Sequence, residues 1–224
     1  MKSPTGTAKA SAMKLTPERP DAPDAARALM HGIFVGEVQA LEGAGRTCWD
    51  FGVAEDGGAD GVPFALKLDM ARQCWDEARH VEIAIKLSDH MGTDVGEFGE
   101  QTMLYEAGCN ADPVLRLTGV NRALEGLAID VFNTMREFGD KAGDPVLEFC
   151  EDWMLADEVT HVKMGSDWLR RITANDPERQ KAALEFQRAV DKVFSFGGFR
   201  GEEEENPVHL ARNFRRLAGF SDDE

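Results

Sequence analysis

A five-residue pattern, Asp-Glu-x-x-His, occurs twice and constrains the fold of this chain more than any other feature. The first copy lies in CWDEARHVEI, residues 74–83, and the second in LADEVTHVKM, residues 155–164. Each copy falls within a segment whose apolar residues recur with helical spacing, so its Glu and His share one face of a helix. Carboxylates that point into an apolar core require a compensating cation. The pattern therefore predicts two helices that bring Glu-x-x-His pairs together around metal.

The apolar spacing places both pairs on the interior face of a helix bundle. The stripe through the first copy is Leu66, Met70, Gln73, Glu77, His80, Ala84, Leu87 and Met91. The stripe through the second copy is Leu147, Glu151, Met154, Glu158, His161, Gly165, Trp168 and Ile172. Alternating steps of three and four residues are typical of helices that bury one face in a bundle.

Proline and glycine divide the rest of the chain into further helical segments. We expect helices at roughly 23–50, 62–91, 112–138, 144–173, 177–194 and 206–217. This predicts an all-α fold: a four-helix bundle with one long crossover and additional C-terminal helices. The expected organisation is a disordered tail at 1–22, the bundle at 23–175 and a C-terminal helical extension at 176–224 packed on the bundle. Within it, the acidic run at 202–205 is expected to be a solvated linker.

Composition narrows the setting of the protein. The 224 residues carry a formal net charge of −16, which disfavours nucleic acid and anionic membranes as partners. The N-terminal segment has no continuous apolar stretch of the kind a signal peptide needs, and no transmembrane segment is evident, so we expect a cytoplasmic protein. The four cysteines form no CxxC pair, which argues against a zinc ribbon or a disulfide framework.

The other two bundle helices are expected to supply one carboxylate each. The sequence ALEG occurs at 40–43 and again at 123–126, offering Glu42 and Glu125. Counting outward from the hairpins places these residues level with Glu77 and Glu158 in antiparallel helix pairs. Glu37 competes with Glu42, because it lies closer to the centre of the apolar face of the first helix. Five positions correspond to about 140° around a helix, so only one of the two can face the site; we favour Glu42.

The Asp that precedes each Glu has its own expected role. A metal-bound imidazole needs an acceptor for its second ring N–H, and a carboxylate is a common partner. We expect Asp157 to contact His80 and Asp76 to contact His161, so that each half of the bundle orients a ligand of the other half.

These motifs resemble those of a known superfamily. One Glu on each of two helices and Glu-x-x-His on each of two others resembles the carboxylate-bridged di-iron or di-manganese site of ferritin-like proteins. DEARH resembles the matching helix of bacterial multicomponent di-iron monooxygenases, and the run GEVQALEG, DEARH, NRALEGLAID, DEVTHVKMGSDWL and ARNFRRLAGF is similar to a bacterial ferritin-like family of unknown function. The resemblance implies the metal ligands Glu42, Glu77, His80, Glu125, Glu158 and His161. In the N-oxygenases of this superfamily, an extra histidine lies one turn before the second Glu-x-x-His pair. In this sequence Met154 takes its place.

Four carboxylates and two imidazoles suit iron or manganese better than copper. We expect two Fe ions, with Mn or a mixed Mn/Fe pair as alternatives. Side chains expected to surround a substrate pocket are Val38, Leu41, Ala128, Phe132 and Met154. A di-iron site in such a pocket, through the resemblance, implies reductive activation of O2.

Three functions are therefore compared. The favoured one is a di-iron oxidoreductase, an oxygenase that uses O2 to hydroxylate or desaturate a small organic substrate and takes electrons from a separate donor such as a ferredoxin or reductase. The first alternative is iron handling, as a ferroxidase or a peroxide scavenger. The second is a non-catalytic bundle that binds metal for stability. A homodimer is compatible with each of these functions.

Overall fold

The computed structural model describes residues 23–54, 61–196 and 208–221. Its elements, in chain order, are α1 (Pro23–Asp50), β1 (Gly52–Val53), β2 (Gly61–Val62), α2 (Phe64–Met91), α3 (Met103–Gly108), α4 (Pro113–Leu117), the π-helix η2 (Thr118–Leu124), α5 (Glu125–Ala142), α6 (Pro145–Ile172), α7 (Pro177–Phe196) and α8 (Arg212–Leu217). The two short strands pair in parallel, Gly52 with Gly61 and Val53 with Val62. The prediction of an all-α bundle is confirmed.

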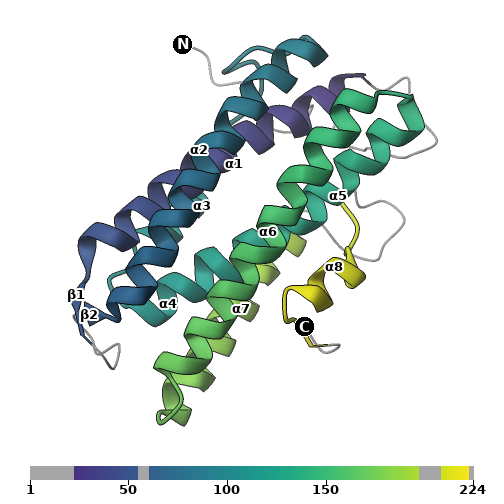
Figure 1. Cartoon of the computed structure of the whole chain (residues 1–224). Coiled ribbons are helices and arrows are strands. Elements are labelled where there is room, and N and C mark those ends of the chain that lie inside the picture. The colour runs from purple at the N-terminus through teal and green to yellow at the C-terminus, as the bar shows by residue number, and fades with distance from the viewer. Residues whose placement is uncertain (1–22, 55–60, 197–207, 222–224) are drawn as a thin grey trace.

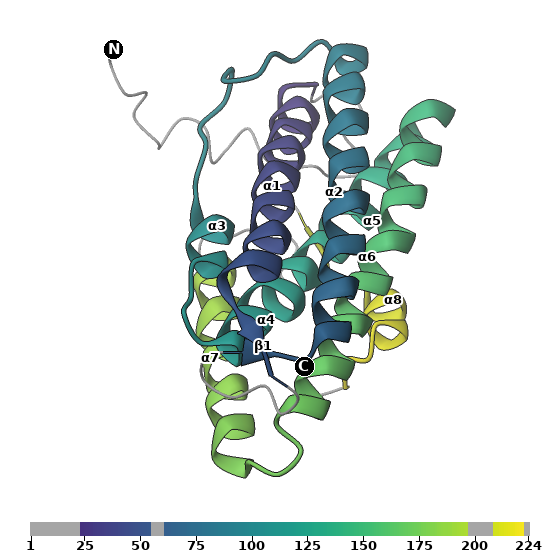
Figure 2. The same ribbon diagram turned by 60° about the vertical axis from the view of Figure 1, so that its left-hand side comes forward.

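The long helices lie side by side as two hairpins (Figure 1). α1 packs along α2, and α5 packs along α6. The chain crosses from one hairpin to the other through residues 92–112, which include α3 and run past α1 (Figure 2). α4, η2 and α5 follow one another without a break, so together they form the third long helical segment.

Local sequence signals account for the ends of the helices that carry the site. Asp112 and Asp144 each cap a helix by accepting hydrogen bonds from two backbone N–H groups, and a proline follows each of them at the first helical position. Gly92 and Gly143 end α2 and α5 in the left-handed conformation, with φ of 71° and 68°. These ends fix where along the bundle each functional side chain lies.

The apolar core is divided along the bundle axis. One cluster includes Met30, Leu87 and Met154, and a second includes Leu66, Leu117 and Trp168. On α2 the first Asp-Glu-x-x-His pattern lies between Met70 of the second cluster and Ala84 of the first. On α6 the second pattern lies between Leu155 of the first cluster and Trp168 of the second. A buried polar layer therefore lies between two apolar regions.

The expected helices agree with the structure except at four places. The third long helix ends at Ala142 rather than at residue 138. α3 was not predicted, the third helix contains the unforeseen π-helical turn η2, and the last helix begins at Arg212 rather than at residue 206. The tail expected at 1–22 and the acidic run at 202–205 lie outside the described residues. Within the extension expected at 176–224, α7 packs on η2 and α4, and α8 packs on α5 and α6. No described helix combines the length and the apolar character needed to cross a membrane.

Candidate metal centre

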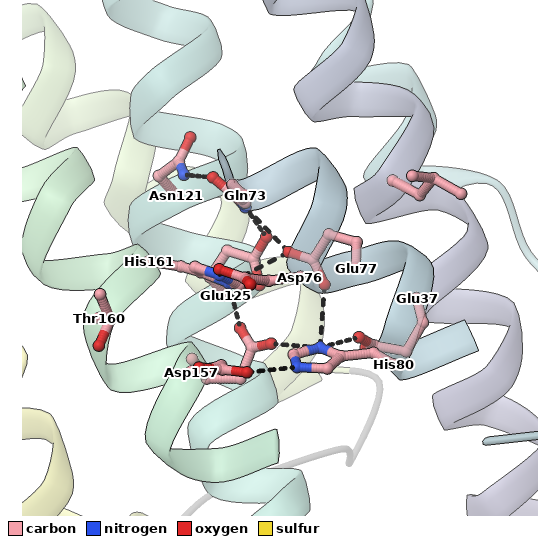
Figure 3. A network of polar contacts seen from close by, with 12 residues as sticks. Glu37, Gln73, Asp76, Glu77, His80, Asn121, Glu125, Asp157, Thr160 and His161 are labelled. Carbon is pink, nitrogen blue, oxygen red and sulfur yellow. Dashed lines mark hydrogen bonds and ion pairs between the residues drawn. The ribbon is translucent and has the colours of Figure 1, made fainter. Parts of the chain in front are cut away.

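Two carboxylates lie between two imidazoles at the centre of the bundle (Figure 3). Glu77 places Oε2 3.1 Å from Nδ1 of His80 and Oε1 3.1 Å from Nδ1 of His161. Glu158 places Oε1 3.2 Å from Nδ1 of His80 and Oε2 3.6 Å from Nδ1 of His161. Each carboxylate therefore directs one oxygen to each histidine, and all four side chains are buried.

One further carboxylate completes each half of the cluster. Glu37 of α1 lies 2.9 Å from Nδ1 of His80 through Oε2. Glu125, the first residue of α5, joins the half that contains His161. Two overlapping groups result, Glu37, Glu77, His80, Glu158 and Glu77, Glu125, Glu158, His161, and within each group the ligand atoms lie within 4.8 Å of one another. Each of these buried groups could hold a metal ion.

The second nitrogen of each histidine contacts an aspartate on the opposite helix. Nε2 of His80 lies 3.3 Å from Oδ2 of Asp157, and Nε2 of His161 lies 3.3 Å from Oδ2 of Asp76. Both contacts expected from the repeated pattern are present. Arg79 pairs with both aspartates and stacks its guanidinium 4.7 Å from the ring centroid of Trp153. The aspartates therefore leave Nδ1 of each imidazole directed at the carboxylates.

A buried amide pair supports the other side of the cluster. Nε2 of Gln73 donates to Oε1 of Glu125 at 2.8 Å and to Oε1 of Glu77 at 3.1 Å, while its Oε1 accepts from Nδ2 of Asn121 at 2.6 Å. Asn121 belongs to η2, the π-helical turn immediately before Glu125. π-Helical turns widen a helix locally and are frequent at functional sites. Gly165 of α6 permits this approach, because a Cβ there would lie 2.4 Å from Cβ of Asn121.

Sequence reasoning did not single out this amide pair. Gln73 falls on the interior stripe one turn before Glu77, and Asn121 falls on the stripe through Glu125. Both residues could have been found in the sequence, because each is a polar side chain at an interior position one turn before a predicted ligand.

Burial and neighbouring charges shift the pKa values of the glutamates in the cluster. Burial raises the pKa of Glu37 to about 8, with the carboxylates of Glu77 and Glu158 adding to the rise and the bond from His80 opposing it. Burial, followed by the charges of Glu158 and Glu77, holds the pKa of Glu125 well above its usual range. Burial also raises the pKa of Glu158, but the charge of His161, together with the neighbouring polar groups of Glu125 and His80, outweighs burial and lowers the pKa of that carboxyl.

The pKa values of both imidazoles are raised, whereas burial alone would lower them. Burial favours the neutral ring, yet the acceptors Asp157 and Glu158 outweigh it and raise the pKa of His80. Burial is likewise outweighed at His161, where the charges of Glu77 and Glu158 raise the pKa. The carboxylates thus hold protons on the rings, which indicates a strong demand for positive charge at this position.

The donor set fits metal ions better than it fits protons. Nδ1 of His80 has three carboxylate oxygens within 3.2 Å, although a ring nitrogen carries at most one proton. Oε2 of Glu77, both oxygens of Glu158 and Nδ1 of His161 are buried without a hydrogen bond. Such atoms are costly to bury unpaired, and a cation between them would satisfy all of them at once. The four glutamates would also balance the charge of two divalent ions.

The choice of Glu42 as the ligand of α1 is wrong. Glu42 is exposed, whereas Glu37 is buried and bonded to His80. The apolar face of α1 runs through Met30, Ile33, Ala40 and Ala44, all buried, and Glu37 lies on it. The ALEG repeat and the equal-height count pointed to Glu42 because they assumed a symmetric hairpin. Burial of the apolar face decided the rotation of the helix instead.

The other predicted ligands, Glu77, His80, Glu125, Glu158 and His161, are brought together. Among the side chains expected around a substrate pocket, Phe132 and Met154 are buried, and the ring of Phe132 meets His80 edge-on at 6.3 Å between centroids. Val38, Leu41 and Ala128 are half-buried.

Glu151, on the same interior stripe of α6 as Glu158, is fully buried, and both of its carboxyl oxygens lack a hydrogen bond. Burial, followed by the charge of Glu37, holds the pKa of Glu151 well above its usual range.

Comparison with known proteins adds a family but no activity. Neither the curated proteins nor the solved structures contain a significant match to the chain. A family model described as "Protein of unknown function (DUF455)" matches residues 3–224, nearly the whole sequence. The chain that builds this buried carboxylate and histidine cluster therefore belongs to the DUF455 family of proteins of unknown function.

Proposed function

We propose that this protein is a di-iron oxidoreductase of the ferritin-like type, which uses O2 to hydroxylate or desaturate a small organic substrate. The observation that carries the proposal is the sharing of Glu77 and Glu158 between two ligand groups, each with its own histidine and its own terminal glutamate. Two metal ions placed side by side need bridging ligands of this kind, whereas a single structural ion needs only one of the two groups.

Iron is the metal that the donors favour. Carboxylate oxygens and imidazole nitrogens are hard to borderline donors that suit Fe(II) or Mn(II), and no cysteine is among the ligand atoms of either group. A reduced pair of ferrous ions would supply two electrons for the reduction of O2, and a separate donor protein would restore them. Turnover therefore requires a reductase or a ferredoxin as a partner.

The chain's own residues would hold the ions and control their surroundings. Asp157 and Asp76 orient the imidazoles, and Gln73 fixes one oxygen of Glu77 and one of Glu125 through N–H donation. The apolar clusters on both sides of the polar layer exclude bulk water from the centre. A dry, rigid centre favours oxidation of a bound substrate over the release of reduced oxygen species.

The test begins with metal analysis of protein purified without added metal. We expect two irons per chain in the wild type and a large loss in Glu77→Ala, which removes a carboxylate shared by both groups. Glu82→Ala, an exposed substitution five residues along the same helix, is the matched control and should retain full metal content. One iron per chain, or zinc in place of iron, would contradict a di-iron centre.

Oxygen consumption then separates the favoured function from iron handling. Chemically reduced protein should consume about one O2 per pair of irons and then stop until electrons and substrate are supplied. A ferroxidase would instead oxidise each new addition of free Fe(II) and release ferric product. Sustained iron oxidation over many additions, with no oxidised organic product, would overturn the oxygenase proposal in favour of iron handling.

A further inference from the structure

The outer face of α2 carries an apolar stripe that is exposed. Phe64, Leu68, Ala71 and Trp75 follow one another at steps of four, three and four residues. The exposed fraction is 58% for Phe64, 56% for Leu68 and 66% for Trp75, and Ala71 is exposed as well. Trp75 and Glu77 are two positions, or about 200°, apart around the helix, so this stripe lies opposite the interior one. Such spacing is typical of the seam between two paired helices.

This outer stripe also lacks negative charge. The exposed residues of the segment 64–75 are Phe64, Ala65, Leu68, Ala71, Arg72 and Trp75. Its one carboxylate, Asp69, is half-buried and accepts a hydrogen bond from Nε1 of Trp168 at 2.7 Å. The chain has 41 acidic and only 25 basic residues, so two copies repel each other over much of their surface. A second copy can therefore approach the outer stripe with less repulsion than elsewhere.

Trp49 of α1 extends this surface. Its side chain is 87% exposed, and Sγ of the adjacent Cys48 lies 3.5 Å from the carbonyl oxygen of Lys67, which places Trp49 level with the outer stripe. At about 200 Å² per aromatic side chain, Trp49, Phe64 and Trp75 together expose roughly 400 Å². A standard interface buries about 800 Å² on each partner. The three aromatic side chains alone therefore supply about half of the area that a stable dimer needs.

The order of residues in the outer stripe makes it complementary to itself. When two identical antiparallel helices are related by a two-fold axis, residue i of one copy meets residue j of the other and the sum of the two numbers is constant. Phe64 with Trp75 and Leu68 with Ala71 have the same sum, so one axis aligns both pairs. This pairing sets a large side chain against a small one and a phenyl ring against an indole. A parallel pairing would instead oppose identical residues, including Arg72 with Arg72.

We propose that this chain forms a homodimer in which the outer stripe of α2 packs antiparallel on the same stripe of a second copy. The self-complementary order of the stripe favours a second copy over an unrelated protein as the occupant. The stripe lies on the opposite side of α2 from the metal ligands, so the inference does not depend on the metal or on the proposed oxidase activity.

Sedimentation of the full-length protein from low to high micromolar concentration tests the dimer. We expect a mass twice that of the 24.7 kDa chain. Leu68→Glu and Ala71→Lys each place a charge in the seam and should raise the dimer dissociation constant at least tenfold. Both positions are exposed within one copy, so circular dichroism should show an unchanged fold. Ile85→Glu, at an apolar side chain that is 42% exposed on another face of α2, is the matched control and should dimerise like the wild type.

Mixing the two charged variants tests the antiparallel register. An equimolar mixture of Leu68→Glu and Ala71→Lys chains should form a heterodimer at least tenfold tighter than either variant forms alone, because the introduced carboxylate meets the introduced ammonium group. The inference is overturned if the wild type stays monomeric, if Leu68→Glu dimerises like the wild type, or if mixing restores no dimer. A monomeric wild type would assign the stripe to a different protein or to another segment of this chain.

Discussion

Asp157 on α6 lies 3.3 Å from Nε2 of His80 on α2, and this contact crosses the interface between the two hairpins. The reverse contact, from Asp76 on α2 to His161 on α6, has the same length. Each Asp-Glu-x-x-His segment thus supplies a ligand pair to the centre and an orienting carboxylate to the other segment. The repeat in sequence is explained by this exchange, because each aspartate contacts the histidine of the other segment.

The exchange predicts a loss of metal affinity when either aspartate becomes an amide. Asp157→Asn and Asp76→Asn keep the side-chain volume but remove the negative acceptor, so we expect metal affinity to fall roughly 10–100-fold with the fold intact. Competition with a chromophoric chelator measures the affinity, and circular dichroism checks the fold. Asp152→Asn, an exposed substitution on the same helix, is the control. Wild-type affinity in both Asp157→Asn and Asp76→Asn would remove any orienting role for the contacts.

Glu37 is predicted to be required for metal binding, and Glu42 is not. Glu37→Ala removes the terminal carboxylate of the His80 group, whereas Glu42→Ala changes an exposed side chain on the same helix. We expect the first variant to lose about half of its metal or more, and the second to retain all of it. Metal analysis after identical purification decides between them. Loss of metal in Glu42→Ala with full retention in Glu37→Ala would mean that α1 is rotated in solution relative to this structure.

Much of the fold followed from periodicity, and the reason is physical. The stripes through Leu66 and Leu147 have the steps of three and four that bundle helices bury, so helix identity and the inward direction of both Glu-x-x-His pairs were predictable. The rotation of α1 about its own axis was not predictable, because Glu37 and Glu42 satisfied different criteria. Burial energy favoured Glu37, and symmetry of spacing favoured Glu42. Packing of the apolar face determined the outcome.

The π-helical turn is the part of the site that sequence could not supply. Residues 118–124 have ordinary helical character, and a π turn arises from tertiary packing rather than from local propensity. Here the close approach of Asn121 to Gly165 accompanies the turn. The turn sets the direction of the residues before Glu125. The sequence could therefore mark Asn121 as an interior polar residue, but it could not predict the contact of Asn121 with Gln73.

Metal binding is predicted to strengthen as pH rises. The pKa of Glu37 is raised to about 8 by burial, and the acidic neighbours of His80 and His161 raise the pKa of both rings. These groups must lose protons before they bind a metal, so protons compete with it at lower pH. Between pH 6 and pH 8, we expect the apparent affinity to rise about tenfold or more per pH unit, with protons released on binding. Chelator competition at several pH values measures this; a pH-independent affinity would contradict it.

Glu151 is predicted to make the stability of the apoprotein fall as pH rises. Burial holds its folded-state pKa well above the ordinary value of 4.5, so the folded chain keeps a proton that the unfolded chain releases. The stabilisation is complete below about pH 4.5 and is lost progressively as pH rises toward the folded-state pKa. Glu151→Gln keeps the shape but cannot ionise. At pH 8 we expect this variant to be more stable than the wild type by about 1–3 kcal/mol in urea unfolding.

The comparison at low pH isolates the titration of Glu151 from other effects of the substitution. About one pH unit below 4.5, both side chains are largely neutral in the folded and the unfolded chain, so the stability difference should largely disappear. Glu42→Gln, the same amide substitution at an exposed position, is the control for the chemical change itself. A constant difference between Glu151→Gln and the wild type at all pH values would indicate a packing effect rather than a titration.

The contact between α6 and η2 gives the last prediction. A Cβ at Gly165 would lie 2.4 Å from Cβ of Asn121, so Gly165→Ala must displace the π-helical turn or α6 itself. We expect a loss of about 1–3 kcal/mol in unfolding free energy. Metal affinity should fall as well, because Asn121 holds Gln73, and Gln73 donates to Glu77 and Glu125.

Gly32→Ala is the matched control for this substitution. Gly32 is also helical, and a Cβ there has no atom within 4 Å. Because alanine is favoured over glycine inside a helix, this variant should be about 0.5–1 kcal/mol more stable than the wild type. Urea unfolding and chelator competition on both variants separate the two effects. If Gly165→Ala keeps wild-type metal affinity despite its lower stability, the packing of Asn121 supports the fold but not the metal centre.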